Sequence, residues 1–477
     1  MKHFAHLTLA AALLTFGCGS DDATNYLGNP GLPPVAVADS FSVIGNGILT
    51  GTLTANDTPN GGIVTSFQSP TTLGGTVSVN AVGQFTYTAP LNQSNVSDTF
   101  TYTLGNSVGN SSATVTIQLG ARGLFVKNDV ATSGNGSQAS PFKTLAEAVT
   151  AAAGINGAQI VVFRGDGSNT GLNTPVALGA NQGIASFDAA SPANITGPVN
   201  LSSGNAVRNL RIAGGPGDAV SGTAASNATL SGLQIEASSG NGVTLVNCTG
   251  TVTVSNSTFR NLPGIGVFAP SDTGNLTWAV SNSSFANVTN RGINTVTFLA
   301  ASHNVTVNNC TASQGGTGEF FAIDALGSGS TGATVSNCNV DGSSTRPRGI
   351  GVLADSTSQV VVLLTANNVT AFTSEGVLLI AGKSTNLKSR LTGNVLNGNI
   401  LNGSAANQGF SAVSTSTASL GLIFQNNVGQ VFSILNTGTS TLAVESLDQF
   451  NTASNNTATL VRTGPITNAP AGSLNIP

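Results

Sequence analysis

The sequence has few charged residues and lacks the cysteine patterns that build metal centres or disulfide scaffolds. Lys, Arg, Asp and Glu make up 7% of the 477 residues, against about 25% in an average soluble protein. The formal net charge of −4 and the absence of a basic stripe exclude a nucleic-acid partner. The four cysteines show no CxxC spacing, which excludes a zinc site and a disulfide framework.

What the sequence does contain is glycine (59 residues), apolar residues (40%) and many Ser, Thr and Asn residues. The apolar fraction is enough for a long core, and the uncharged polar residues must keep the surface soluble. This composition is typical of secreted β-rich proteins and not of a cytosolic helical enzyme. The length suggests more than one domain.

The first 17 residues have the features of an export signal. Lys2 and His3 precede a short apolar run at residues 7–14, which is too short to span a bilayer. The stretch "LLTFGCGSDD" resembles a bacterial lipoprotein signal, in which the cysteine, here Cys18, becomes the lipidated first residue. Residues 18–33 would form a polar tether. The resemblance implies an exported protein anchored by lipid in a membrane, at the cell surface (outer membrane) or in the periplasm. An ordinary secretory peptide with an incidental cysteine is the alternative.

Residues 34–120 contain short alternating stretches such as "GQFTYTAP" and "DTFTYTLGN", separated by turn residues, which predicts an antiparallel β-sandwich. With "LTANDTPNGG" and "SATVTIQL" they resemble the bacterial cadherin-like, immunoglobulin-type repeat of surface proteins, which implies a spacer or binding module. Calcium rigidifies cadherin-type relatives, so the resemblance makes Asp39, Asp57 and Asp98 the candidate calcium ligands. Asp57 also fits an ordinary turn.

From residue 161 to about residue 440 the chain repeats one pattern, seen in "VTVSNSTF" (252–259) and "WAVSNSSF" (278–285). The repeat can be followed through an Asn, or once Gly232, at intervals of 23 to 32 residues. A drifting period of this size is typical of a solenoid, whose coils must stack to bury their apolar faces. The Asn markers are Asn209, Asn256, Asn282, Asn309, Asn337, Asn367, Asn394 and Asn426.

The geometry of one repeat explains the asparagine. Val252 and Val254 share one face of an extended strand, and Phe259 would point away from it unless the chain bends in between. A residue in the left-handed region makes such a bend, and Asn tolerates that region better than any residue except Gly. Stacked coils would place Asn on Asn at about 4.8 Å, where amides can form a ladder. A leucine-rich repeat would also carry Asn, but its LxxLxL frame is absent.

The pattern resembles the right-handed parallel β-helix of the pectin-lyase-like superfamily, with about ten coils here. The segment "SPFKTLAEAVTAAA" predicts a short helix that begins with a capping box of Thr144 and Glu147. Residues 121–160 would form an N-terminal cap, and residues 441–477 a last coil and C-terminal cap. Cys310 and Cys338 fall in one column of adjacent coils, either as buried thiols or as a disulfide.

When the strands are aligned by "RGINTV" (291–296), the alignment predicts one surface patch of charged and aromatic side chains on neighbouring coils, with Glu319 and Arg346 nearby. The patch offers an aromatic ring, cations for an acidic polymer and one acid; its candidate residues are Arg291, Phe321, Asp324, Arg348 and Glu375. Arg348 and Glu375 also fit an ordinary cross-strand ion pair. This alignment places no second acid beside Asp324, so a hydrolase dyad is not visible.

These observations predict a non-catalytic surface lipoprotein that presents a β-helix face to polysaccharide or another envelope component. The superfamily includes pectate lyases and polygalacturonases, so the alternative is a lyase or glycoside hydrolase acting on an acidic polysaccharide. The third hypothesis is a purely structural envelope protein. No cofactor other than calcium is indicated.

Overall fold

The computed structural model describes residues 31–313, 315–343, 345–398, 408–437, 439–447 and 457–477. The chain forms two compact units, residues 1–120 and residues 121–477. The predicted signal peptide and the lipidation site Cys18 lie outside the described residues. In the described part of the chain no helix has the length and apolar character needed to cross a membrane.

The first unit is an antiparallel β-sandwich, as predicted. One sheet has the strand order β1-β7-β6-β3 and the other β2-β5-β4, and aromatic and aliphatic side chains fill the space between them. A 3-10 turn at Leu53–Ala55 follows the second strand. The strands are β1 (Asp39–Gly45), β2 (Ile48–Thr52), β3 (Ile63–Phe67), β4 (Thr76–Val79), β5 (Gln84–Thr88), β6 (Val96–Gly105) and β7 (Asn110–Val126). The last residues of β7 belong to the second unit, where they pair with its strand β8 (Gln159–Val162).

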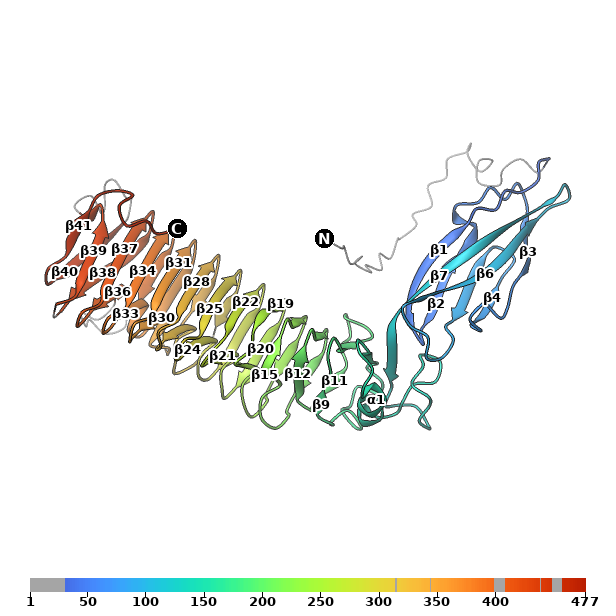
Figure 1. Ribbon diagram of the computed structural model, residues 1–477, viewed down its shortest axis with the longest axis horizontal. Coiled ribbons are helices and arrows are strands. Elements are labelled where there is room, and N and C mark those ends of the chain that lie inside the picture. Colours follow the sequence, from blue (N-terminus) through green and yellow to red (C-terminus); the bar gives the residue numbers. More distant parts are fainter. Residues whose placement is uncertain (1–30, 314, 344, 399–407, 438, 448–456) are drawn as a thin grey trace. The chain divides into compact units, whose positions relative to one another are not determined.

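The second unit is a parallel β-helix of about ten coils, in which each full coil adds one strand to each of three faces. Figure 1 shows these strands stacked coil upon coil from green to red. Face A precedes the Asn bend and comprises β8 (Gln159–Val162), β10 (Gly183–Ser186), β13 (Ala206–Arg208), β16 (Thr229–Ser231), β19 (Gly250–Ser255), β22 (Asn275–Ser281), β25 (Ser302–Asn308), β28 (Ser330–Ser336), β31 (Gln359–Thr365), β34 (Asn386–Thr392), β37 (Ser419–Gln425), β39 (Thr441–Glu445) and β41 (Thr467–Ala469).

Face B follows the bend and comprises β11 (Asn194–Ile195), β14 (Arg211–Ala213), β17 (Gln234–Glu236), β20 (Thr258–Leu262), β23 (Ser284–Val288), β26 (Thr311–Ser313), β29 (Asn339–Asp341), β32 (Asn368–Phe372) and β35 (Val395–Gly398). Face C completes each coil and comprises β9 (Val176–Ala177), β12 (Val199–Ser203), β15 (Val220–Ser226), β18 (Val243–Val246), β21 (Val267–Ser271), β24 (Ile293–Thr297), β27 (Phe321–Ala325), β30 (Arg348–Ala354), β33 (Glu375–Ala381), β36 (Gln408–Ser414) and β40 (Thr457–Thr463). The strand β38 (Val428–Asn436) pairs with both β35 and β36, so the two faces merge in that coil.

The predicted left-handed bends are present and line up between faces A and B. Six of the predicted asparagines have φ between 49° and 55°, and Gly232 has φ 65°. They are Asn209, Asn256, Asn282, Asn309, Asn337 and Asn426. The side chain of Asn309 donates to Asn282 Oδ1 at 2.8 Å, which is one rung of the predicted amide ladder. Val252, Val254 and Phe259 are all buried, so the bend does turn both strands toward one core.

In two coils the prediction of the bend residue is wrong by one position. The positive φ belongs to Ala366 and Gly393, and the following Asn367 and Asn394 lie inside the core at 2% and 0% exposure. There Asn367 Nδ2 donates to Asn394 Oδ1, and Asn394 Nδ2 donates to Asn427 Oδ1, both at 2.9 Å. An inner ladder of buried amides therefore replaces the outer one in these coils, because buried amides must find partners in the next coil.

The helix α1 (Leu145–Ala152) begins with the predicted capping box. The Thr144 hydroxyl accepts from the Glu147 backbone N–H, and the Glu147 carboxylate accepts from the Thr144 backbone N–H at 2.9 Å. Leu145 and Ala148 are fully buried and pack against the first coils. At the other end, Lys388 Nζ donates to the Leu474 carbonyl, so the C-terminal segment lies against the outer side of face A.

Candidate functional site

Charged side chains gather on face C in four successive coils. The register aligns Ile293 with Phe321, and Phe321 with Ile350, so these buried residues share one column. The residues two positions before that column alternate in charge along the β-helix: Arg291, Glu319, Arg348 and Glu375. A parallel stack places such neighbours about 4.8 Å apart, which is within reach of direct ion pairing.

The four side chains form a continuous chain of ion pairs. Arg291 Nε lies 3.0 Å from Glu319 Oε2, and Arg348 Nη1 lies 3.3 Å from Glu319 Oε1. Arg348 Nε lies 2.8 Å from Glu375 Oε2. The ion pair between Arg348 and Glu375 is the one that the sequence predicted, and Glu319 extends it to a four-membered ladder.

A fifth charged residue, Asp324, joins the ladder from β27. Its Oδ2 lies 2.6 Å from Arg291 Nη1, so one guanidinium holds two carboxylates. Four of these charged residues, all except Glu375, line a cavity of about 140 Å³, together with apolar residues of β30 and β33. The apolar part of the lining includes Leu353, Leu378 and Ile380.

The two carboxyl groups on Arg291 differ in their protonation behaviour. Burial would raise the pKa of Glu319, but its own backbone N–H and the two arginines outweigh burial, and the pKa lies below its ordinary value. At Asp324 burial outweighs the opposing effect of Arg291, and the charge of Glu319 adds to it, so the pKa is raised. The cavity therefore holds one acid that stays ionised and one that is protonated more readily.

Arg346 lies under this cluster and has a different role. Its side chain is buried, and the guanidinium donates to the carbonyls of Asn290 and Gly318, each at 2.9 Å, and to that of Val288. Two of these carbonyls belong to the residues directly before the charged residues of the β24 and β27 coils. Burial lowers the pKa of Arg346 to about 10, which leaves it charged at neutral pH. Arg346 thus fixes the backbone that carries the site.

The predicted role of Phe321 is wrong. Its side chain is fully buried in the core and cannot stack on a ligand. The sequence alignment was shifted by two residues in this coil, because Phe320 stands where the neighbouring coil has Gly292. The corrected register puts Glu319 into the charged column and supplies the second acid beside Asp324, which sequence reasoning missed. The two consecutive phenylalanines, Phe320 and Phe321, are the feature of the sequence that could have revealed this shift.

The three aspartates predicted as calcium ligands do not form one group. Asp57 accepts from Tyr102 and from the Val37 backbone N–H, and its charge acts on Asp39 nearby. Asp98 instead accepts hydrogen bonds from hydroxyl and backbone donors elsewhere in the sandwich, including Tyr87. In the described residues no group of three acidic, His or Cys side chains is arranged to hold a metal ion. The donor set does not fit a shared calcium site.

The stacked cysteines lie inside the core. Cys310 and Cys338 are buried free thiols, as is Cys248. Each thiol has a carbonyl within hydrogen-bonding distance, for example Val280 for Cys310 at 3.6 Å. The contact with Cys338, together with burial, raises the pKa of Cys310, so this thiol stays protonated at neutral pH.

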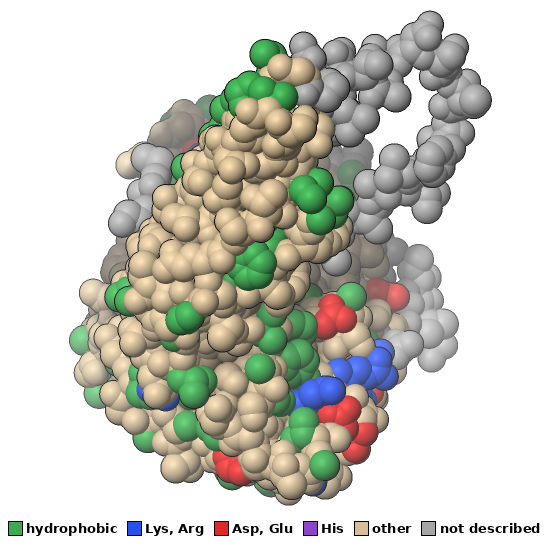
Figure 2. All heavy atoms as spheres, turned by 90° about the vertical axis from the view of Figure 1, so that its right-hand side faces the viewer, with side chains coloured by type: hydrophobic (Ala, Val, Ile, Leu, Met, Phe, Trp, Pro, Cys, Tyr) green, Lys and Arg blue, Asp and Glu red, His purple; other side chains and the backbone are tan. Residues whose placement is uncertain are grey.

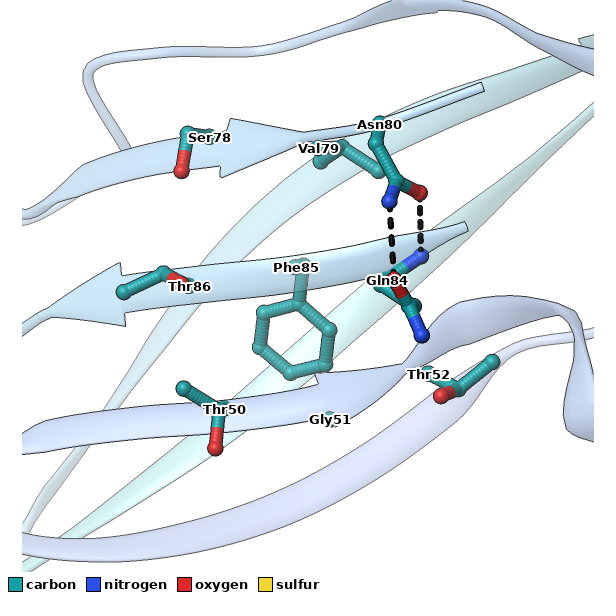
Figure 3. Close-up of a pocket in the computed structure, with 9 residues that line it drawn as sticks. All are labelled: Thr50, Gly51, Thr52, Ser78, Val79, Asn80, Gln84, Phe85 and Thr86. Atoms are coloured by element: carbon teal, nitrogen blue, oxygen red, sulfur yellow. Dashed lines mark hydrogen bonds between the residues drawn. The ribbon is translucent and has the colours of Figure 1, made fainter. Parts of the chain in front are cut away.

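Two other hollows have uncharged linings. A shallow pocket of about 650 Å³ lies on the sheet β2-β5-β4 of the sandwich (Figure 3), where Asn80 and Gln84 exchange two hydrogen bonds. A groove of about 400 Å³ follows the bends at Asn256, Asn282 and Asn309. Figure 2 shows a face of the molecule on which uncharged side chains and backbone predominate. Among the three hollows, only the cavity on face C contains charged groups.

Comparison with known proteins identifies the first unit. Residues 32–121 match the family model of the bacterial cadherin-like domain. None of the curated proteins matched the chain by sequence.

Solved structures that resemble the chain include two mannuronan C-5 epimerase A-modules from Azotobacter vinelandii. That of AlgE6 has 16% identity and a TM-score of 0.40, covering 68% of this chain and 94% of its own. That of AlgE4 has 13% identity and a TM-score of 0.39, covering 66% and 96%. The catalytic unit of a GH87 α-1,3-glucanase from Streptomyces thermodiastaticus has 12% identity and a TM-score of 0.36, covering 82% and 75%. The protein thus joins a bacterial cadherin-like domain to a parallel β-helix.

Proposed function

We propose that the protein is a bacterial surface protein that binds polysaccharide in the cavity on face C. A lipid on Cys18 anchors the chain at the cell surface, and the cadherin-like domain separates the β-helix from the membrane. The glycan is bound and not cleaved.

The observation that carries this proposal is the mixed lining of the cavity. Arg291, Glu319, Asp324 and Arg348 offer hydrogen-bonding groups whose positions are fixed by their mutual ion pairs. Aliphatic side chains of β30 and β33 complete the lining. A sugar ring has hydroxyl groups around its edge and C–H groups on its faces, so this lining matches both of its surfaces.

A purely structural ion-pair ladder is the competing interpretation. Partly buried ion pairs gain little net stability, because the desolvation of each charge offsets the attraction. The chain has only 34 charged residues, 15 basic and 19 acidic, yet four of them line one cavity and a fifth, Glu375, pairs with one of the four. Such a concentration of costly charges at a concave site favours a binding role.

The direct test is a glycan array probed with residues 19–477. Binding of at least one polysaccharide is expected, and Arg348→Ala should weaken it at least tenfold by removing two of the ion pairs. Arg260→Ala is the matched control, since Arg260 pairs with Glu236 on face B at an exposed position outside the cavity. Loss of binding in both variants, or in neither, would refute the assignment of the site.

A second candidate function is glycoside hydrolysis, which one specific observation favours. Glu319 and Asp324 share the Arg291 guanidinium and have pKa values shifted in opposite directions. A general acid and a general base need pKa values that lie apart, and the shifts of this pair go in that direction. Asp324 would protonate the glycosidic oxygen. In that case Asp324→Asn abolishes the release of reducing ends while the glycan still binds. A lyase has less support, because both arginines of the cluster are held by carboxylates.

A further inference from the structure

The charge balance of the cavity bears on which sugar it holds. The cluster contains two guanidinium groups, Arg291 and Arg348, and three carboxylates, and the charged Arg346 beneath it interacts with Glu319, so the positive and negative charges balance when all are ionised. Each guanidinium already contacts two carboxylates: Glu319 and Asp324 for Arg291, and Glu319 and Glu375 for Arg348. The nearby Arg346 donates to backbone carbonyls. The described cluster therefore contains no arginine that lacks a carboxylate or carbonyl partner.

We infer that the cavity selects an uncharged sugar unit and discriminates against a uronate; the inference rests on the proposed function. A ligand carboxylate would meet a site that has no net positive charge to attract it. To form the two-point pair with a guanidinium that a carboxylate favours, it would have to displace Glu319, Asp324 or Glu375, whose side chains are only 14–17% exposed. Leaving a largely buried carboxylate without its partner is strongly unfavourable.

A neutral hydroxyl group avoids this conflict. In the described structure no hydrogen bond uses Nη2 of Arg291 or of Arg348, so each can donate to a hydroxyl oxygen without losing an ion pair. A hydroxyl can also donate to a carboxylate oxygen, which a uronate carboxylate cannot.

The apolar part of the lining fits the same ligand. Leu353, near the end of β30, is 38% exposed, and Leu378 and Ile380 continue the apolar lining on the next coil. Gly351, which precedes Leu353 on β30 and pairs with Leu378, has no side chain, and a Cβ there would lie 2.8 Å from the Glu319 side chain. The glycine thus keeps Glu319 and the leucines on one continuous surface, where the C–H face of a neutral ring can pack beside the charged groups.

The test compares three sets of oligosaccharides of equal length and linkage. One is neutral, one is oxidised to the carboxylate at C6, and one carries a free 2-amino group; binding to residues 19–477 is measured by calorimetry. The neutral set should bind at least tenfold more tightly than the carboxylate set. Glu375→Gln, which removes one negative charge and loosens one partner of Arg348, should reduce this preference at least threefold, with Arg260→Ala unchanged.

The outcomes separate the two proposals. Equal or tighter binding of the carboxylate or amino set overturns the preference for a neutral sugar, while the binding function stands. Failure of all three sets to bind, across the linkages tested, overturns the binding function, and the preference falls with it. Circular dichroism of Glu375→Gln confirms that the variant is folded, and an unchanged preference in a folded Glu375→Gln variant also contradicts the inference.

Discussion

The sandwich and the β-helix stabilise their carboxylates with different partners. In the sandwich, Asp98 is fully buried and is surrounded by neutral donors: the hydroxyls of Thr71, Thr72 and Tyr87 and the backbone N–H of Leu73. In the β-helix, Glu319 is held by two arginines at the edge of a cavity. The neutral donors around Asp98 enclose its carboxylate and leave no room for a ligand. The two arginines that hold Glu319 keep further N–H donors at the surface.

The strongest test of this comparison removes the enclosed carboxylate. Asp98→Ala leaves several buried donors without an acceptor, and we expect the sandwich to lose about 3 kcal/mol or more. Tyr87 and Tyr102 lie in the sandwich, and the single tryptophan, Trp278, lies in the β-helix. Near-ultraviolet circular dichroism of the tyrosines should therefore change at lower denaturant concentration, while Trp278 fluorescence stays as in the parent protein.

Asp272→Ala is the control for this experiment, because Asp272 is exposed. A shift of the Trp278 transition as large as the tyrosine shift would show that the enclosed carboxylate stabilises more than its own domain.

A smaller effect is expected when the buried cation of the β-helix is replaced. Arg346→Gln loses most of the hydrogen bonds to the carbonyls of Val288, Asn290 and Gly318, which should cost about 2–3 kcal/mol. Here the Trp278 transition should move and the tyrosine signal should not. Glycan binding should weaken as well, although Arg346 does not line the cavity, because the backbone before the charged residues is released.

One result would contradict the positioning role of Arg346. If Arg346→Gln unfolds like the parent protein but loses glycan binding, Arg346 contacts the ligand and is not a positioning residue. Arg346→Lys serves as the conservative variant. Because a lysine reaches fewer carbonyls than an arginine, the stability and glycan binding of this variant should fall between those of the parent protein and of Arg346→Gln.

The sequence predicted the β-helix well because each coil repeats the same constraint. The bend at Asn256 recurs at Asn282 and Asn309, and each repetition supports the others. The alignment of individual coils, however, was wrong by one or two residues in places. Where Ala366 took the bend, Asn367 moved into the core, and where Phe320 replaced glycine, the charged column moved from Phe321 to Glu319. Because of this one shift of register, the sequence alignment did not place Glu319, the second acid of the site, beside Asp324.

The sandwich was predictable as a fold, but the roles of its aspartates were not. Alternation within each strand shows which face is buried, yet it does not show which loops approach a side chain. The donors to Asp98 come from Thr71 and Thr72, more than 25 residues away in the sequence. Only the three-dimensional arrangement shows that this carboxylate is already satisfied and that Asp39 and Asp57 are near each other.

The smallest effect is expected at Asp39, where burial, and then the charge of Asp57, raise the pKa from 3.8 to about 6. Between these two pH values the folded state binds more protons than the unfolded state, so the sandwich loses stability as the pH rises from about 4 to about 6. Asp39→Asn removes this loss. The variant should match the parent near pH 3.5 and be about 1 kcal/mol more stable above pH 6.5, a value reduced for the partial exposure of Asp39. Denaturant titrations followed through the tyrosines at five pH values measure the difference, with Asp272→Asn as a control that should show the same pH dependence as the parent protein. A variant less stable than the parent at neutral pH would instead mean that the ionised pair of Asp39 and Asp57 stabilises the domain, as it would with a bound cation.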